Sequence, residues 1–173
     1  MQLESERLIL RPFTLNDTHI LCQLANDPCL AKWTQSFSKP FTFKRAEQWL
    51  RKTITETEQL INITLSVRLK NDGTLIGAVS VKLSEVDSAE IGYWLGFAHH
   101  GKGYCVEAVR EVIRFAFSEY NFSKTSGHCD CNNLASAQVM IRSGMHLSEQ
   151  THTPVIINGK SVALNTYEIF CQS

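Results

Sequence analysis

The fold is decided by residues 89–120, which read AEIGYWLGFAHHGKGYCVEAVREVIRFAFSEY. Residues 89–95 are apolar and aromatic, as in a strand, whereas residues 104–120 repeat apolar side chains at the period of a helix. Gly101 and Gly103 stand between them and let the backbone approach a bulky group. The free N–H groups at the helix start favour an anion. The stretch predicts a strand, a phosphate-binding loop and a helix, although a Gly-x-Gly pair alone also fits an ordinary turn.

Composition limits the class of protein. The chain has 173 residues, 43% hydrophobic and 20% charged, with 17 basic and 17 acidic side chains. We expect a single domain over residues 1–173, because this length supports a substantial core. The balanced charge does not indicate nucleic-acid binding, and no apolar run reaches the ~20 residues that span a bilayer. The opening residues, MQLESER, lack a signal-peptide core, so we expect a cytoplasmic protein that binds no membrane.

The cysteine content is also consistent with a cytoplasmic protein. Six cysteines without a signal peptide are expected to be reduced thiols. Residues 128–131, His-Cys-Asp-Cys, form the one cluster that suggests a metal. Their spacing is tighter than that of a zinc site, and no second pair follows at a matching distance. We therefore expect no metal.

The remaining elements follow from periodicity and turn residues. Helices are expected over residues 16–26, 43–58 and 135–143. Strands are expected over residues 8–12 (an edge strand, since it ends in proline), 61–69, 75–83, 124–129, 145–150 and 161–171, with hairpin turns at 71–73 and Asn158-Gly159. The helix between the strands at 89–95 and 124–129 implies a crossover. The sheet is therefore mixed, antiparallel at first and locally parallel, in an α+β fold of the α/β-sandwich type.

At this level the chain resembles the GNAT superfamily of acyl-CoA-dependent N-acetyltransferases, in particular its ribosomal-protein N-terminal acetyltransferase branch. Matching motifs lie, in the expected order, at residues 7–12, 90–95 with 101–104, 133–136 with 143–144, and 158–167. The resemblance implies a mostly antiparallel sheet of about six to seven strands, splayed in the middle, with about four helices on both faces. It also implies that acetyl-CoA, the cosubstrate, lies in the gap.

The resemblance implies a set of cofactor-binding residues. The loop amides would hold the pyrophosphate, the strand would pair with the pantetheine, and the next helix start would lie near the sulfur. The set comprises Ile91, Gly92, Tyr93, His99, His100, Gly101, Lys102, Gly103, Tyr104, Asn133 and Ser136. The alternative is that both histidines are merely exposed, and that Asn133 and Ser136 are only helix caps.

Two catalytic residues are implied in the same way. Glu90 stands where several family members carry the general base, and the alternative is a structural glutamate. Ser136 is the expected partner of the sulfur, since Met140 replaces the tyrosine that many relatives use as the acid. Tyr167 is a further candidate proton donor, or a sheet tyrosine packed by its ring. Cys105 is either a reactive thiol at a helix N-terminus or a small buried side chain.

The acceptor is the least defined part. Aromatic residues between the first helices either line a pocket or belong to the core. Trp33 and Phe37 are the pocket candidates because they precede Pro40 in a loop. Tyr167 is a further expected substrate contact. The resemblance implies direct transfer to a primary amine, a protein N-terminus or a small amine, in a ternary complex. The alternative is a non-catalytic CoA-binding sensor or interaction module. Homodimers occur in the family, and the sequence leaves that state open.

Overall fold

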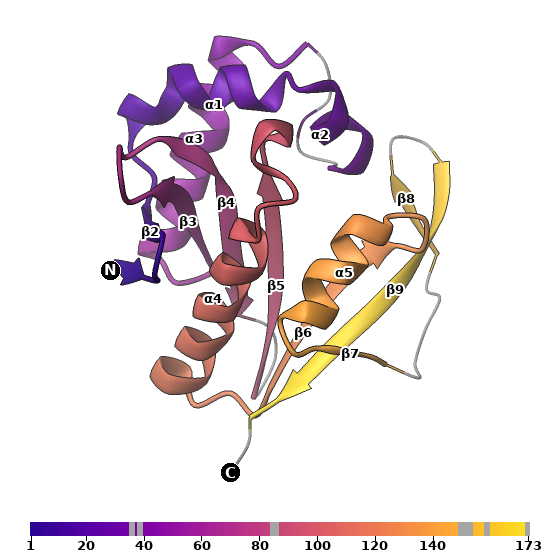
Figure 1. The fold of residues 1–173 in the computed structure, drawn as a ribbon. Coiled ribbons are helices and arrows are strands. Elements are labelled where there is room, and N and C mark those ends of the chain that lie inside the picture. Colours follow the sequence, from indigo (N-terminus) through magenta and orange to yellow (C-terminus); the bar gives the residue numbers. More distant parts are fainter. Residues whose placement is uncertain (35–36, 38–39, 84–86, 149–153, 158–159, 172–173) are drawn as a thin grey trace.

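A computed structural model describes the chain except for residues 35–36, 38–39, 84–86, 149–153, 158–159 and 172–173. The expected turn at Asn158-Gly159 lies outside the described residues. The described part is a mixed sheet with helices on both faces (Figure 1).

The sheet is mostly antiparallel. Its strands are β1 (Leu3–Glu4), β2 (Leu8–Pro12), β3 (Asn62–Leu69), β4 (Leu75–Leu83), β5 (Ser88–Leu95), β6 (Lys124–Asp130), β7 (His146–Leu147), β8 (Pro154–Ile157) and β9 (Lys160–Phe170). Their order is β1-β2-β3-β4-β5-β6-β9-β7, with β8 paired to β9. Among the described strands, only β5 and β6 pair in parallel, because the crossover between them contains a helix.

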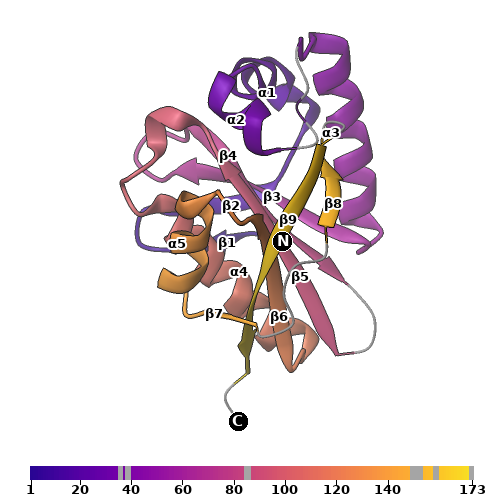
Figure 2. The ribbon, with the colours of Figure 1, turned by 90° about the vertical axis from the view of Figure 1, so that its right-hand side faces the viewer.

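The helices cover the sheet on two sides. They are α1 (Thr18–Ala25), α2 (Pro28–Trp33), α3 (Phe43–Glu58), α4 (Tyr104–Tyr120) and α5 (Leu134–Arg142), with short 3-10 turns η1 (Leu15–Asp17) and η2 (Phe97–His99). Figure 2 shows α4 and α5 on one side of the sheet and α1 and α3 on the other. The Thr42 hydroxyl caps α3 by accepting from the Arg45 N–H at 3.3 Å, as the sequence predicts.

Each face of the sheet has its own hydrophobic core. The larger core joins alternate residues of β3 to β5 to the apolar stripe of α4, including Val109 and Val112. The smaller core joins α1 and α3 to the opposite face and is rich in aromatic side chains. Phe37, Phe41 and Trp94 are part of it, and the rings of Phe37 and Trp94 meet edge to face at 5.1 Å. Side-chain alternation along β5 therefore sends successive residues into different cores.

The sheet opens between β5 and β6. Their parallel register ends at Ile91 and Gly127, although both strands continue for several residues. Figure 1 shows the two strands side by side at one end and diverging toward α2 at the other. At the branch point, a Cβ on Gly127 would lie 3.3 Å from the Met140 Cε atom, so a larger residue would require the Met140 side chain to shift by a few tenths of an ångström. Met140 is 1% exposed and fills this position.

The expected fold class is confirmed, with differences at the margins. The strand at 8–12 is not an edge, because β1 pairs beyond it. The helix at 16–26 is η1 followed by α1, and α2 is a helix where we expect a loop. In place of one strand at 145–150, the described residues contain the two-residue β7. The short elements β1, β8 and α2 bring the described chain above the expected strand and helix counts.

Candidate active site

A cleft of about 550 Å³ lies where β5 and β6 separate. Its size is typical of sites for small molecules and cofactors. One wall is formed by α2, another by the end of β5 and the glycine loop, and the third by the end of β6 with α5. Tyr93 and Trp94, which belong to opposite faces of the sheet, both line it. The opening between β5 and β6 is therefore lined from both faces of the sheet.

The glycine loop leads directly into the N-terminus of α4. Gly101 and Gly103 have φ angles of +74° and +82°, which side chains disfavour, so the loop needs glycine. Gly103 is the N-cap of α4, and no described side chain caps the helix there. The first-turn residues Tyr104, Cys105 and Val106 all line the cleft. An uncapped helix start in a glycine cradle fits a phosphate or pyrophosphate group.

Arg7 fastens this loop to the N-terminal segment. Its guanidinium donates to the Lys102 carbonyl at 3.0 Å and lies 4.6 Å from the centre of the Tyr104 ring. It also forms an ion pair with Glu107 of α4, with 2.6 Å between Nη2 and Oε2. Glu107 in addition accepts from the Ser5 hydroxyl and the Arg7 N–H. A segment a hundred residues away in the chain thus fixes the loop's position.

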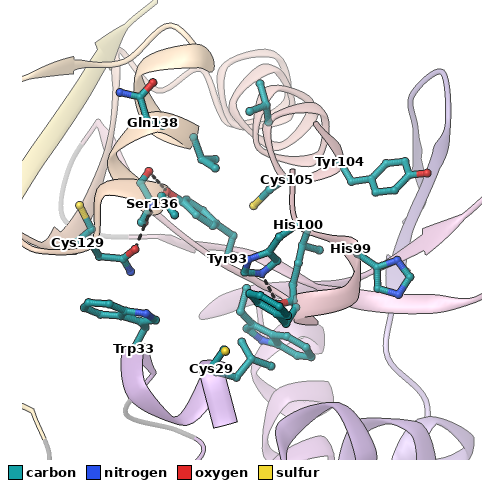
Figure 3. Close-up of a pocket in the computed structure, with 18 of the residues that line it drawn as sticks. Cys29, Trp33, Tyr93, His99, His100, Tyr104, Cys105, Cys129, Ser136 and Gln138 are labelled. Atoms are coloured by element: carbon teal, nitrogen blue, oxygen red, sulfur yellow. Dashed lines mark hydrogen bonds between the residues drawn. The ribbon is translucent and has the colours of Figure 1, made fainter. Parts of the chain in front are cut away.

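The two loop histidines both line the cleft. The exposed His100 ring makes a 2.9 Å hydrogen bond to the Leu95 carbonyl, which ties the loop to the end of β5 (Figure 3). Burial, then the neighbouring charges of Lys102 and His100, lower the pKa of His99. His99 is therefore neutral near pH 7 and offers one N–H to a ligand.

Ser136 and Tyr93 meet on the far side of the cleft. The Tyr93 hydroxyl lies 2.9 Å from both the carbonyl oxygen and the Oγ atom of Ser136 (Figure 3). The Asn133 side chain accepts from the Ser136 N–H at 3.2 Å and caps α5. Asn133 is thus a helix cap that also lines the cleft. Burial raises the pKa of Tyr93, although the hydrogen bond to Ser136 acts in the opposite direction.

Two thiols in the wall are poor nucleophiles. Burial raises the pKa of Cys105 to about 12. Burial also raises the pKa of Cys129, against the effect of its hydrogen bond with Ser136. Only the thiolate form of cysteine attacks, so both thiols are inert at neutral pH. For Cys105 this supports the interpretation as a buried small side chain.

Helix α2 forms the wall opposite α5. It contributes Cys29, Leu30 and Trp33, and Figure 3 shows Trp33 across the cleft from Ser136. The sequence signal for α2 is Asp27 followed by Pro28. The Asp27 side chain caps the helix by accepting from the Cys29 N–H at 2.8 Å. Proline favours the first helical position. The sequence analysis missed this helix because six residues are too few for a clear period.

The structure brings together nine of the residues expected from the sequence. Tyr93, His99, His100, Gly101, Gly103, Tyr104, Asn133, Ser136 and Trp33 all line the cleft. The sequence assigned no site role to several other lining residues, among them Trp94, Phe97, Gln138 and Arg142, and it considered His128 and Asp130 only as part of a possible metal cluster. His128 and Asp130 come after the point where β6 separates from β5. Whether they line a cleft therefore depends on where the sheet opens, and the local sequence does not specify that point.

Six expected residues lie outside the cleft lining. Phe37 is 1% exposed and Tyr167 5% exposed; both belong to the cores, because ring packing buries them. Ile91 is also a core residue, and Gly92 precedes the cleft on β5. The Lys102 ammonium turns back to donate to the Ala98 carbonyl at 3.0 Å. Glu90 lies in the paired part of β5, between Lys82 of β4 and Ser126 of β6. Because it is three residues from Tyr93 along the strand, its side chain points to the opposite face of the sheet.

Within the described residues, no three His, Cys, Asp or Glu side chains are grouped to hold a metal ion. No described helix is long and apolar enough to cross a membrane.

Comparisons with known proteins agree with this geometry. A family model described as an acetyltransferase (GNAT) domain matches residues 7–146. The N-acetyltransferase p20 of Bacillus licheniformis is 30% identical over 80% of this chain and 78% of its own length. The ribosomal-protein-serine acetyltransferase of Escherichia coli is 28% identical over 94% of this chain and 92% of its own.

Solved structures show the same fold. The microcin C7 self-immunity acetyltransferase MccE, solved with acetyl-CoA and AMP, superposes with a TM-score of 0.87 at 20% identity, covering 96% of this chain and 94% of its own. The glycine loop, the divergent strands and the family match together lead to one conclusion. The chain belongs to the GNAT family of acyl-CoA-dependent N-acetyltransferases.

Proposed function

We propose that the protein transfers an acetyl group from acetyl-CoA to the α-amino group of a protein or peptide, by direct attack in a ternary complex. The observation that carries this proposal is the cleft itself, which has an anion-binding helix start on one side and an apolar wall on the other. The donor supplies a thioester carbonyl that an amine can attack.

The residues present fit the donor. The amides of the α4 start, beside Gly101 and Gly103, would hold the pyrophosphate. Beyond Ile91, β5 is no longer paired with β6, so its backbone can take an extended pantetheine as an added strand. Ser136, which lines the cleft on the α5 side, would be the hydroxyl available to the sulfur. Lys102, whose ammonium binds the Ala98 carbonyl, would contribute its backbone rather than its charge.

Charge in the cleft argues for the acceptor class. Among the described residues that line it, Asp130 is the one carboxylate, and Arg142 carries the opposite charge. Polyamines and aminoglycosides carry several positive charges, and such a surface does not attract them. The remaining acceptor wall is apolar and aromatic, with Leu30, Trp33 and Phe97. Similarity to the E. coli ribosomal-protein-serine acetyltransferase supports a protein N-terminus.

The test is thiol release from acetyl-CoA in the presence of an acceptor panel. It contains peptides with a free N-terminus, the same peptides blocked at that end but carrying lysine, a polyamine and an aminoglycoside. We expect turnover with the free peptides and none with their blocked counterparts. Turnover with the polyamine alone would overturn the acceptor class. Binding of acetyl-CoA without turnover on any amine would instead favour the non-catalytic module.

The base that removes the amine proton is a carboxylate in this proposal. Glu90 is the residue expected from the family, whereas Asp130 is the carboxylate that lines the cleft. A base must come within hydrogen-bond reach of the proton it removes, so Asp130 is the better placed of the two. Glu90→Gln and Asp130→Asn decide between them. The acidic limb of the kcat/KM–pH profile should disappear in the variant that lacks the base and persist in the other.

A further inference from the structure

Tyr93 bridges the open part of the sheet. It lies on β5 beyond the last residue paired with β6, and its ring packs against the larger core. Its hydroxyl reaches the first turn of α5 at 2.9 Å from two different atoms of Ser136. A strand wall and a helix wall of the cleft are thereby joined through one phenol (Figure 3).

The two contacts allow two arrangements of the hydrogen bonds. A phenol has one proton, and a carbonyl oxygen accepts only. If Tyr93 donates to the Ser136 carbonyl, the Ser136 hydroxyl must donate to the Tyr93 oxygen to keep the second contact. If Tyr93 instead donates to Oγ, the Ser136 proton is free to point into the cleft. The serine hydroxyl thus donates either to the Tyr93 oxygen or into the cleft, and rotation of the phenol O–H bond determines which.

We propose that Tyr93 is a positioning residue that turns the Ser136 hydroxyl toward the donor's sulfur as the thioester breaks. This inference rests on the proposed function, because it assigns Ser136 a partner in that reaction. The amine nitrogen forms a bond to the carbonyl carbon, the carbon–sulfur bond breaks, and its electron pair goes to sulfur. Ser136 donates to that sulfur, and Tyr93 moves its own donation from the carbonyl to Oγ. The proton that the amine loses finally neutralises the thiolate.

The surroundings of Ser136 explain why it needs such a partner. A serine in the first turn of a helix readily donates to the backbone carbonyls of the preceding residues. Cys129, on β6, also shares a hydrogen bond with it. Without Tyr93, these neighbours compete for the hydroxyl. Because burial raises the pKa of Tyr93, its phenol keeps its proton over the whole working pH range and remains a donor.

The closing experiment uses Tyr93→Phe, which keeps the ring that fills the gap and removes only the hydroxyl. We expect kcat to fall by about tenfold to a hundredfold, less than the roughly hundredfold to thousandfold for loss of a direct donor to developing charge, because Tyr93 acts through Ser136. KM for acetyl-CoA should change less than about twofold, because the contacts to the phosphates remain. Tyr120→Phe is the matched control, since Tyr120 packs against Phe115 and Phe122 away from the cleft, and it should keep the wild-type rate.

The double variant Tyr93→Phe/Ser136→Ala separates positioning from a structural role. If Tyr93 acts through Ser136, the double variant has the kcat of Ser136→Ala alone. Losses that multiply, or a Tyr93→Phe enzyme with the wild-type kcat, would overturn the inference. Failure of the proposed function would give a different result. The wild-type protein would still be stabilised against melting by acetyl-CoA, but it would release no thiol with any amine.

Discussion

At the scale of single residues, burial controls the chemistry of the cleft. Cys105 and Cys129 lie in its wall, yet burial raises the pKa of both thiols. Both thiols are therefore protonated at neutral pH and are not activated as nucleophiles. The exposed Cys29, on the rim formed by α2, is the cleft-lining cysteine most open to reagents.

Alkylation rates test this assignment. At pH 8, Cys29 should be modified first among the cleft-lining cysteines. Cys105 should react about a thousandfold more slowly in the native protein than in urea, since its pKa of about 12 replaces a free value near 8.5. Peptide mapping by mass spectrometry after timed quenching gives both rates. Equal rates for Cys105 in the native and denatured chains would contradict the assignment.

The residue scale also shows where prediction from the sequence stops. Trp33 and Phe37 are aromatic residues four apart, and nothing local distinguishes them. The structure puts Trp33 on the cleft and Phe37 against Trp49 and Trp94, because packing between distant elements decides the matter. Strand alternation, in contrast, already implies that Glu90 and Tyr93 face opposite ways. Ser136 was expected at the site because residues 133–136 resemble the family's second cofactor helix, and it does line the cleft.

At the scale of elements, the N-terminal segment is the anchor of the glycine loop. Glu107 receives hydrogen bonds from Ser5 and Arg7, and Arg7 continues to the Lys102 carbonyl. Burial raises the pKa of Glu107, but the hydrogen bonds from Ser5 and Arg7 and the charge of Arg7 outweigh it, so the net pKa lies below the usual 4.5. The charged form of Glu107 therefore stabilises the folded protein.

Glu107→Gln should show this stabilisation and its pH dependence. We expect a loss of about 1 to 2 kcal/mol at pH 7, where a hydrogen-bonded charge is removed. Because the folded pKa is depressed, the contribution is complete above the unfolded pKa and is lost as pH falls through the folded one. The difference between wild type and variant should therefore be smaller at pH 3 than at pH 7.

Thermal melting at the two pH values measures the difference. Glu111→Gln is the control, since its partner on the same helix, Arg114, is 71% exposed and the pair contributes little. A Glu107→Gln deficit that stays constant down to pH 3 would contradict the assignment.

Arg7→Ala tests the same anchor by function. Without the guanidinium, the Lys102 carbonyl and the Tyr104 ring lose their shared support. We expect KM for acetyl-CoA to rise several-fold while kcat changes little, because the loop binds the phosphates and not the reacting carbonyl. Steady-state kinetics with varied acetyl-CoA measures both constants. A fall in kcat at an unchanged KM would show that the loop has another role.

Elements were predictable from the sequence in proportion to their length. The periodic α3 and α4, and the hairpin strands β3 and β4, lie within a residue or so of their predicted limits. The helix α2 and the strand β1 are six and two residues long, too short to show a period. The glycine loop could be predicted because its backbone geometry restricts the residue type, whereas its anchor at Arg7 depends on a contact made by folding.

At the scale of the whole molecule, the cleft is bounded by elements that are far apart in the sequence. The proposed function places the donor along α4 and α5 and the acceptor beside α2, and residues of all three helices line the cleft. A sequence can predict the parallel crossover that makes this opening possible, as residues 89–120 do here. How far β6 diverges, and hence that Asp130 and His128 face the opening, depends on the packing of both cores.

This arrangement predicts sequential kinetics. Both substrates can be bound together, and the cleft offers no activated thiol to carry the acetyl group. Initial rates measured over a grid of acetyl-CoA and peptide concentrations should give intersecting reciprocal plots. Parallel plots, or an acetylated protein seen by intact mass spectrometry after mixing with acetyl-CoA alone, would indicate a covalent intermediate instead.

The separation of β5 from β6 at Ile91 and Gly127 also bears on solubility. A free strand edge is a template for pairing with other chains, and proteins protect such edges. Here the free stretch of β5 lies inside a cleft between α2 and α5, where another sheet cannot enter. Something as narrow as a single extended chain still can. The unpaired edge of β5 can therefore still pair with a single extended chain, while its position in the cleft shields it from the sheets of other copies of the protein.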